Sequence, residues 1–563
     1  MMKLGYTAEK NTLILISLLK AHGIKKIIAS PGTTNVSFVL SVQNDPFFQV
    51  FSAFDERAAA FMACGMSEET GEAVVLSCTG ATASRNYIPG LTEAYYKKLP
   101  ILAVTSTQHI GKAGSYSAQF IDRSQQFSDM VKHSAQIDVI YTKESEELTV
   151  NAINKAILEL YNDQPGPVHI NLATQFSNDF SVEELPHYRK ISKIKKNDVF
   201  PELSGKKIGV FAGAHETFDS KTTDAIDAFC SKFNAIVLCD QTSNFRGKYR
   251  VLASLINSQI FFSESTIQFD TIIYIGYVSG AYLNIRPKEV WRVNPDGEFR
   301  DPFNKLTYIF QMTELDFFSY YDNNNDNYSD LLQQCIEERN YIESKIPELP
   351  FSNIWIAQHT AKLIPQNSVI HFGILNSLRS WNYFETPDTV SCFCNTGGFG
   401  IDGCVSSIIG AALVNKNKQY YCVLGDLAFF YDINVLFEKI PSNVHIMIIN
   451  NGVGVEFKNY SHRCSAFGHN ADPFIAAKGH NGFKSSNLLK NVADSIDMRY
   501  LSASSKEEYL ANIDQWLTLS DKAVIFEVFI EEQDDIASLK TINMLGINFK
   551  KRILNKVCRI FSR

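Results

Sequence analysis

Short apolar runs bounded by glycine, proline or aspartate recur along the chain, and amphipathic stretches of helical length separate them. Continuous β-branched runs with helices between them are typical of parallel sheets that helices cover on both faces. The runs predict strands in three groups: 25–30, 50–54, 74–79, 101–105 and 168–172; 208–211, 235–239 and 271–277; and 369–372, 389–394, 420–424, 444–449 and 524–530. The pattern therefore predicts an α/β protein made of open parallel sheets flanked by helices.

Two polar segments divide the chain. Residues 187–206 carry a run of basic side chains, and residues 321–330 form an Asn/Asp-rich stretch that cannot bury apolar surface. The chain of 563 residues is also too long for one core, because domains usually contain about 150 residues. We predict three domains, over residues 1–186, 200–335 and 350–540, followed by a tail over residues 541–563.

The composition is that of a globular protein with substantial cores. Apolar residues make up 45% of the chain and charged residues 20%, which argues against a disordered, collagen-like or coiled-coil protein. An uninterrupted apolar run long enough to span a membrane is missing, as is a signal-peptide cleavage site near the N-terminus. The eleven cysteines are scattered and mostly fall in apolar runs, which predicts buried free thiols in a reducing compartment. We therefore expect a cytoplasmic protein.

The net charge of −7 is unevenly distributed. Residues 541–563 contain six basic and no acidic residues, so the rest of the chain is acidic, which argues against nucleic acid as a partner. From residue 547 onward, apolar residues recur near helical spacing with basic residues between them. Such a helix can lie on the inner face of a membrane, so residues 547–563 are a candidate peripheral membrane contact. The alternatives are a helix docked on the protein itself or a frayed end.

The strongest chemical signal lies in the third predicted domain. Gly425-Asp426 follows the strand at 420–424, a helix is predicted over 427–440, and Asn450-Asn451-Gly452 follows the next strand. Neighbouring parallel strands end at the same edge of a sheet, so Asp426 and Asn451 can share one cation. Carboxylate, amide and carbonyl oxygens suit Mg²⁺, and the main-chain N–H groups where helices begin suit a diphosphate.

This arrangement resembles the metal motif of the thiamine-diphosphate-dependent enzymes of the acetolactate synthase and decarboxylase group. The segment GDLAFFYDIN…INNG is most similar to the menaquinone-pathway succinyl-enolpyruvyl-cyclohexenecarboxylate synthase branch, which lacks the second Gly of Gly-Asp-Gly. The resemblance implies that Asp426, Asn451 and the main-chain oxygen of Val453 bind Mg²⁺. It also implies thiamine diphosphate as cofactor, with Gly425, Leu427 and Gly452 beside it. The three domains would then be pyrimidine-binding, middle and diphosphate-binding domains.

The first domain holds the residue that the resemblance identifies as catalytic. The strand at 50–54 is followed by Asp55-Glu56-Arg57, which opens a predicted helix. The resemblance implies that Glu56 hydrogen-bonds the aminopyrimidine of the cofactor and favours the imino tautomer, which deprotonates the thiazolium carbon. The alternative is an acidic residue placed favourably at a helix N-terminus.

Further segments extend the resemblance over nearly the whole chain. Thr79 and Gly80 follow the strand after the helix of Glu56, at family positions of the cofactor site. Residues 398–403 resemble the Gly-Ile-Asp-Gly segment of the menaquinone branch, which implies that Gly400 and Ile401 touch the cofactor and that Ile401 is the wedge holding it bent. Asn376 and Ser377 likewise match cofactor-site residues. The alternatives are a core isoleucine beside a glycine-rich turn and, for 376–377, an ordinary turn after a strand.

The substrate site departs from the menaquinone branch. Where that branch carries substrate-binding arginines, this chain has Thr34, Gln108, Trp381 and Thr396, and Arg379 is two positions out of register. Without those guanidinium groups most bidentate recognition of carboxylates is lost, so we expect a less anionic acceptor. Residues 108–127 are closer to the substrate loop of acetolactate synthase. The predicted substrate pocket consists of Thr33, Gln108, Gln119 and Phe120.

Together the motifs predict a transferase or lyase, specifically a thiamine-diphosphate-dependent carboligase acting on a 2-oxo acid and a carbonyl acceptor. A simple 2-oxo acid decarboxylase, a catalytically silent cofactor-binding protein and an unrelated nucleotide-binding oxidoreductase are the alternatives. The middle domain lacks a full Gly-x-Gly-x-x-Gly, so FAD is not supported. In the resembling family the first and third domains meet across a subunit interface, which implies a homodimer or tetramer with a shared active site.

Overall fold

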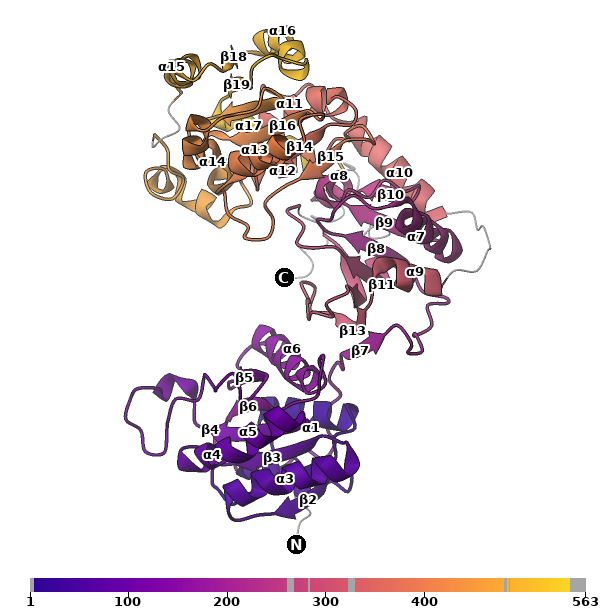
Figure 1. Ribbon diagram of the computed structural model, residues 1–563, viewed down its shortest axis with the longest axis vertical. Coiled ribbons are helices and arrows are strands. Elements are labelled where there is room, and N and C mark those ends of the chain that lie inside the picture. Colours follow the sequence, from indigo (N-terminus) through magenta and orange to yellow (C-terminus); the bar gives the residue numbers. More distant parts are fainter. Residues whose placement is uncertain are drawn as a thin grey trace, which may run out of the picture. The chain divides into compact units, whose positions relative to one another are not determined.

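The computed structural model describes residues 5–260, 268–281, 284–321, 330–479, 484–485 and 487–546. It contains three sheets of six, seven and six strands (Figure 1). The chain divides into two compact units, one of residues 1–194 and 297–309 and the other of residues 195–296 and 310–563. The predicted α/β class, with three parallel-sheet domains flanked by helices, is confirmed. Most of the Asn/Asp-rich stretch and the basic tail from residue 547 lie outside the described residues.

The first sheet has the strand order β2-β1-β3-β4-β6-β5, and all its strands are parallel. Its strands are β1 (Lys26–Ala29), β2 (Gln49–Ser52), β3 (Val74–Cys78), β4 (Ile101–Thr107), β5 (His133–Ile137) and β6 (Val168–Ala173). The helices of this domain are α1 (Lys10–Ala21), α2 (Val36–Gln43), α3 (Glu56–Thr70), α4 (Thr82–Asn86), α5 (Ile88–Lys97) and α6 (Lys143–Glu159), with the 3₁₀ turn η1 (Ile110–Lys112).

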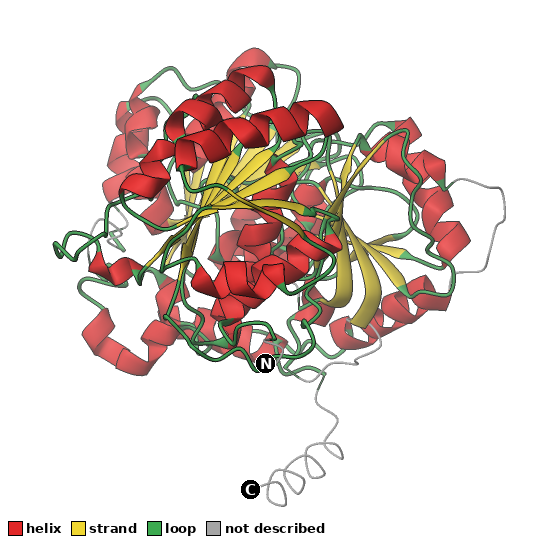
Figure 2. Ribbon diagram, turned by 90° about the horizontal axis from the view of Figure 1, so that it is seen from below, coloured by secondary structure: helices red, strands yellow, loops and turns green. Residues whose placement is uncertain are grey.

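Alternation along each strand explains why helices cover both faces of this sheet. Ile27, its register partner Val75, and Leu102, which pairs with Val75, belong to a core shared with α1, α2 and α6. The next residue, Ile28, points the other way and joins a second core with α3 and α5. Successive strand side chains alternate between faces, so apolar residues in a row bury both faces at once. Figure 2 shows sheets with helices on either side.

The second sheet has the order β10-β9-β8-β11-β12-β13-β7. Its strands are β7 (Ser192–Lys195), β8 (Ile208–Ala212), β9 (Ile236–Cys239), β10 (Arg250–Leu252), β11 (Gln268–Ile275), β12 (Arg286–Val293) and β13 (Leu306–Gln311). The helices around it are α7 (Ser220–Phe233), α8 (Ser254–Asn257), α9 (Glu314–Tyr320) and α10 (Asp330–Glu343), with η2 (Gln241–Ser243).

The third sheet has the order β15-β14-β16-β17-β19-β18, and its strands are parallel. The strands are β14 (Val369–Phe372), β15 (Ser391–Phe393), β16 (Tyr420–Gly425), β17 (Val444–Asn450), β18 (Arg499–Ala503) and β19 (Val524–Phe529). The helices are α11 (Asn353–Thr360), α12 (Asn376–Trp381), α13 (Cys404–Val414), α14 (Asp426–Tyr431), α15 (Leu488–Ser495), α16 (Lys506–Leu517) and α17 (Glu532–Ile542), with η4 (Ala361–Leu363), η5 (Ile433–Phe437), η6 (Val455–Lys458) and η7 (Arg463–Ala471).

The first and third sheets share one topology. Numbered by their appearance within each domain, the strands of both follow the order 2-1-3-4-6-5. In both sheets the order reverses beside the first strand, between β1 and β3 and between β14 and β16. Ligands of open α/β sheets bind beyond the carboxyl ends of the strands at such a switch point. The topology therefore directs attention to the loops after β1, β3 and β4 and after β14, β16 and β17.

The helix predicted over 427–440 is shorter in the structure. The helix α14 ends at Tyr431, and the 3₁₀ segment η5 follows. Asp432 stands at the break, and its carboxylate accepts hydrogen bonds from the main-chain N and the Oγ of Ser406 on α13, at 2.7 and 2.5 Å. These bonds hold Asp432 against α13, and its backbone, with φ of −114° and ψ of 8°, leaves the helical conformation, so α14 ends here.

The second and third sheets belong to the same unit because a polar junction joins them. The side chain of Asn244 accepts from the main-chain N of Cys392 at 2.8 Å and donates to its carbonyl at 2.9 Å. Asn382 Oδ1 accepts from the main-chain N of Gln241, also at 2.8 Å. The ten described cysteines are free and eight of them are buried, as predicted. Among the described residues, no helix has the length and apolarity needed to cross a membrane.

Candidate functional site

The predicted metal ligand Asp426 is the first residue of α14 and follows directly after β16. Only 1% of its surface is exposed, and this burial raises the pKa of its carboxyl to about 7. Main-chain N–H groups of Leu427, Gly452 and Asn451 oppose that rise by stabilising the ionised form. The oxygen Oδ2 is buried and has no hydrogen-bond partner among the described residues. Because buried polar atoms are nearly always satisfied, this oxygen indicates a missing cationic or donor group.

Asn451 lies beside Asp426 because β16 and β17 are neighbours in register, with Gly425 opposite Ile449. Asn451 is 7% exposed, and hydrogen bonds fix both the oxygen and the nitrogen of its side-chain amide. Its Oδ1 accepts from the main-chain N of Val453 at 3.2 Å, and its Nδ2 donates to Asp535 Oδ2 at 3.2 Å. Gly452 has φ of 71°, a left-handed conformation that lets the chain turn sharply after the strand.

These donors fit Mg²⁺. The expected ligand set consists of one carboxylate, one amide oxygen and the carbonyl of Val453, which are hard oxygen ligands. In the part of the chain that the structure describes, no group of three or more His, Cys, Asp or Glu residues could hold a metal. A site here would thus depend on the amide and the carbonyl as well as on Asp426, whose unpartnered oxygen is the feature that suits a cation.

Asp535 on α17 connects these residues to Asn376, and the sequence analysis did not identify it. Its carboxylate is 5% exposed and accepts from Asn353 N at 2.7 Å, from Asn451 Nδ2 and from Asn376 Nδ2 at 3.4 Å. Burial raises its pKa to about 6. In the sequence, Asp535 stands among four acidic residues of the segment EEQDD, which indicates only the first turn of a helix.

Asn376 and Ser377 open α12 directly after the loop that follows β14. The preceding residue, Leu375, has φ of 68° and ψ of −115°, a conformation that is rare for a leucine and is retained only where the surroundings enforce it. Ser377 is buried. The structure thus brings Asn376 to the same carboxylate as Asn451.

Gly400 and Ile401 precede α13 in the third domain. A Cβ at Gly400 would lie 2.7 Å from the carboxylate of Asp402, so the backbone passes close to that side chain. Ile401 is half-buried and packs against the core that α13 forms with the third sheet. These contacts are those of the core isoleucine considered above, and the wedge role of Ile401 remains a prediction.

Glu56, in the first unit, is the first residue of α3. Asp55 rather than Glu56 caps the helix, because Asp55 Oδ1 accepts from the main-chain N of Arg57 at 2.9 Å and of Ala58 at 3.2 Å. Glu56 is half-buried, and its Oε2 accepts from Asn86 Nδ2 at 3.1 Å. The side chain of Glu56 therefore does not serve as the helix cap. Asn86, which no sequence motif identified, holds one of its carboxylate oxygens.

Thr79 and Gly80 lie beyond β3, at the switch point of the first sheet. The hydroxyls of Thr79 and Thr34 are 2.6 Å apart, and Thr34 Oγ1 donates to the carbonyl of Ser106 at 3.2 Å. Thr34 therefore ties together the segments that follow β1 and β3 and the end of β4. A Cβ at Gly80 would lie 3.3 Å from the carbonyl oxygens of both Ser106 and Gln119, so only a residue without a side chain fits comfortably.

The four predicted substrate residues also lie beyond the first sheet, Thr33 after β1 and the others after β4. Thr33 and Gln119 are exposed, while Gln108 and Phe120 are half-buried. Gln108 Oε1 accepts from Lys112 Nζ at 2.5 Å. The carbonyl oxygen of Gln119 lies close to Gly80, so this loop packs against the predicted cofactor segment. All of these residues and Glu56 belong to the first unit, whereas the metal residues belong to the second.

Comparison with known proteins agrees with the cofactor prediction. Residues 11–133 match the family described as thiamine pyrophosphate enzyme, N-terminal TPP binding domain. Relatives named 2-succinyl-5-enolpyruvyl-6-hydroxy-3-cyclohexene-1-carboxylate synthase include one from Bacteroides fragilis, 29% identical over 95% of this chain and 98% of the relative. The relative from Flavobacterium johnsoniae is 26% identical over 93% of this chain and 97% of its own length. The one from Desulfotalea psychrophila is 23% identical over 91% of this chain and 96% of its own length.

The matched segment contains Glu56, Thr79 and Gly80. The comparisons therefore support a thiamine-diphosphate-dependent enzyme, since thiamine pyrophosphate is the same cofactor. The relatives carry the name of the branch that the Gly-Asp and Asn-Asn-Gly segments resemble. They do not support the more specific similarity to acetolactate synthase.

Proposed function

We propose that the protein is a Mg²⁺- and thiamine-diphosphate-dependent carboligase that decarboxylates a 2-oxo acid and transfers the acyl group to a carbonyl acceptor. The observation that carries this proposal is the buried, unpartnered Oδ2 of Asp426 beside the oriented amide of Asn451. A purely structural carboxylate would have its hydrogen bonds satisfied. The matched cofactor-binding domain and the shared topology of the first and third sheets support the same function.

In this proposal Asp426, Asn451 and the carbonyl of Val453 hold Mg²⁺. The main-chain N–H groups of Leu427 and Gly452 stabilise the ionised form of the Asp426 carboxyl, which is the form that binds a cation. Thiamine diphosphate, when bound, supplies the carbon nucleophile that stabilises an acyl carbanion equivalent.

Glu56 holds and passes a proton at the aminopyrimidine of the cofactor. Asn86 donates to Oε2 and so restrains the carboxyl, which leaves Oε1 to serve as the proton-transfer atom. Thr79 and Gly80, at the switch point of the same sheet, line the place for the pyrimidine ring.

The overall reaction balances without an oxidant. A 2-oxo acid R–CO–COO⁻, a proton and an aldehyde R′–CHO give R–CO–CH(OH)–R′ and CO₂. The bond between the carbonyl carbon and the carboxylate breaks, a new carbon–carbon bond forms, and the proton ends on the new hydroxyl group.

The surfaces of two helices support a homodimer. The helix α3, which starts with Glu56, exposes Ala58, Phe61, Met62 and Gly65, and α13 exposes Ser407, Gly410, Ala411 and Val414. Both sets have the spacing of one helix face, and side chains as exposed as Phe61 (47%) and Val414 (87%) are typical of an interface. In a dimer built on these faces, Glu56 lies at the start of an interface helix.

A cofactor titration tests the proposal. Circular dichroism should report saturable binding of thiamine diphosphate that requires Mg²⁺, and a panel of 2-oxo acids with aldehydes should give CO₂ and a hydroxyketone. Glu56→Gln should keep cofactor binding and lose product formation, while Glu144→Gln, a change at an exposed glutamate on α6, should leave both unchanged. Free aldehyde as the sole product across the panel favours a decarboxylase, and absence of CO₂ with every 2-oxo acid favours a silent binding protein.

A further inference from the structure

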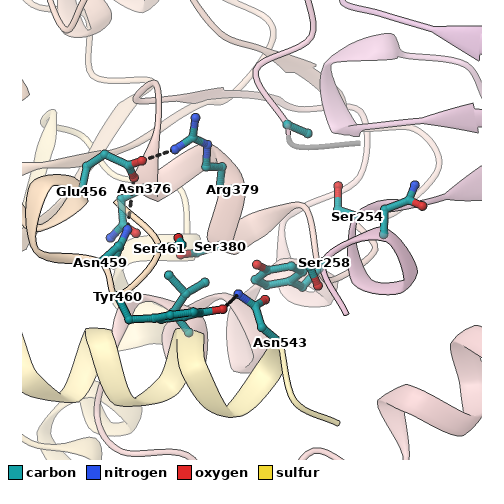
Figure 3. A pocket seen from close by; sticks show the side chains of 14 residues that line it. Ser254, Ser258, Asn376, Arg379, Ser380, Glu456, Asn459, Tyr460, Ser461 and Asn543 are labelled. Atoms are coloured by element: carbon teal, nitrogen blue, oxygen red, sulfur yellow. Dashed lines mark hydrogen bonds and ion pairs between the residues drawn. The ribbon is translucent and has the colours of Figure 1, made fainter. Parts of the chain in front are cut away.

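The second unit contains a cavity of about 390 Å³ between elements of the middle and third domains. This volume lies within the range of about 300–1,000 Å³ that is typical of small-molecule sites. The lining residues on which the argument depends are Ser254, Asn257, Asn376, Arg379, Glu456 and Asn543. Figure 3 shows Ser254 and Ser258 on one side of the space and Glu456 and Asn459 on the other.

The lining is rich in hydrogen-bonding groups and has no net charge. It contains four serines, four asparagines and two tyrosines, against one basic and one acidic residue. Those two, Arg379 and Glu456, form an ion pair with each other, as Figure 3 shows. Asn459 Nδ2 also donates to Glu456 at 3.2 Å. The charge of Arg379 is therefore offset within the site, and the described lining contains no surplus cation for a carboxylate or phosphate.

Several polar atoms of this lining are buried without a partner. Ser254 Oγ and Asn257 Oδ1 make no hydrogen bond within the described residues, although only 4% and 6% of these residues are exposed. Asn543 Oδ1 is likewise unsatisfied, while its Nδ2 donates to Tyr460 at 2.7 Å. A buried polar atom left unpaired is destabilising, so these atoms favour a ligand that donates hydrogen bonds. The hydroxyl groups of a ligand can both donate and accept hydrogen bonds, so they suit the amide oxygens of Asn257 and Asn543 and the hydroxyl of Ser254.

The cavity adjoins the proposed cofactor site. Asn376 lines it and also donates to Asp535, the carboxylate that orients the proposed metal ligand Asn451. The lining segment 456–461 begins three residues after Val453. The cavity is thus connected through Asn376 and Asp535 to the proposed metal ligand Asn451.

We propose that this cavity binds the acceptor, and that the acceptor is an uncharged, polyhydroxylated aldehyde of the open-chain sugar type. The inference rests on the proposed function, in which the acyl group from the 2-oxo acid adds to the aldehyde carbon and the proton ends on the new hydroxyl. The remaining hydroxyls of the acceptor satisfy Ser254, Asn257 and Asn543.

Binding measured without cofactor tests the cavity separately from catalysis. Saturation-transfer NMR on the full chain, with no thiamine diphosphate added, compares xylitol with gluconate, which has a similar chain of hydroxyls and one carboxylate. We expect wild type to bind xylitol and to bind gluconate at least tenfold more weakly. Asn257→Leu and Ser254→Ala should each weaken xylitol binding about tenfold, whereas Asn491→Leu, an exposed asparagine on α15, should not. Tighter binding of gluconate, or binding of neither polyol, overturns the proposal, because the cavity then holds an anion or only water.

A charge change sharpens the test. Glu456→Gln removes the carboxylate that offsets the charge of Arg379 and so gives the lining a net positive charge, and the preference should shift at least tenfold towards gluconate. An unchanged preference contradicts the argument that this ion pair sets the specificity. In the holoenzyme with a 2-oxo acid, failure of the proposed function appears as absence of CO₂. Failure of the present inference appears as normal CO₂ release that does not respond to D-erythrose as acceptor.

Discussion

Replacement of Asp426 by asparagine should change how the stability of the metal-free protein depends on pH. In the folded protein burial raises the pKa of this carboxyl from 3.8 to about 7. Below about pH 4 the carboxyl is protonated in the folded and unfolded chains, and its contribution to stability is fully present. As the pH rises towards 7, the unfolded chain releases the proton and the folded protein retains it. The free energy of unfolding therefore falls over this range, and the loss is complete above pH 7.

The size of the effect follows from the pKa. A tenfold change in proton affinity corresponds to about 1.4 kcal/mol. For this almost fully buried carboxyl, a rise in pKa from 3.8 to about 7 removes about 4 kcal/mol of stability between pH 4 and pH 8. Asparagine has the same shape and stays neutral, so Asp426→Asn should avoid this loss. Asp535, whose pKa burial raises to about 6, is present in both proteins and affects both alike.

Urea unfolding in EDTA at pH 4.5, 6, 7 and 8 measures the difference. The four tryptophans, Trp291, Trp355, Trp381 and Trp516, are buried in the second unit, so their fluorescence reports on the unit that contains Asp426. Part of the loss has already occurred at pH 4.5, so we expect the stability of the variant relative to wild type to rise by about 3 kcal/mol from pH 4.5 to pH 8. Added Mg²⁺ should stabilise wild type more at pH 8 than at pH 5, because protons compete for the ligand, and should not stabilise the variant. A difference between the two proteins that does not change with pH would refute the reasoning.

Four further predictions concern the other parts of the proposed enzyme. Glu56→Gln should slow exchange of the thiazolium C2 proton, followed by NMR, at least hundredfold while cofactor affinity stays within about twofold; exchange at the wild-type rate would exclude the proton-transfer role. Asp535→Asn should weaken Mg²⁺ affinity about tenfold or more by calorimetry, because the amide of Asn451 loses its charged orienting partner, and an unchanged affinity would contradict that role. Met62→Asp should shift the protein from dimer to monomer in light scattering, since it buries a charge in the proposed interface; a wild-type dimer would argue against α3 as the contact. A chain ending at Lys540 should lose co-sedimentation with anionic liposomes that the full-length chain shows, and equal, negligible binding by both would leave only a docked or frayed tail.

Much of the fold and part of the site can be predicted from the sequence because their signals are local. Buried central strands such as β3 and β16 are continuous apolar runs, and their alternation between two cores follows from strand geometry alone. Strands β5, β7, β10, β12, β13 and β18 escaped prediction because polar residues shorten or interrupt their apolar runs. Of these, β5, β7, β10 and β18 are edge strands with a partly exposed face, whereas β12 and β13 lie inside the second sheet. Asp426, Asn451 and Glu56 could be identified from the sequence because each lies just after a predicted strand.

The tertiary structure alone decided which distant side chains meet at those strand ends. Asp535 lies 84 positions from Asn451 and 159 from Asn376, yet its carboxylate binds both amides. Asn86 is 30 positions from Glu56, and Arg379 is 77 positions from Glu456. Periodicity reports only whether a residue faces a core, since it reflects geometry within one helix or strand. The strand order and the packing of helices against the sheets determine which polar groups pair, which remain unpaired as in Asp426 and Asn257, and therefore where a cation or a polyhydroxylated ligand fits.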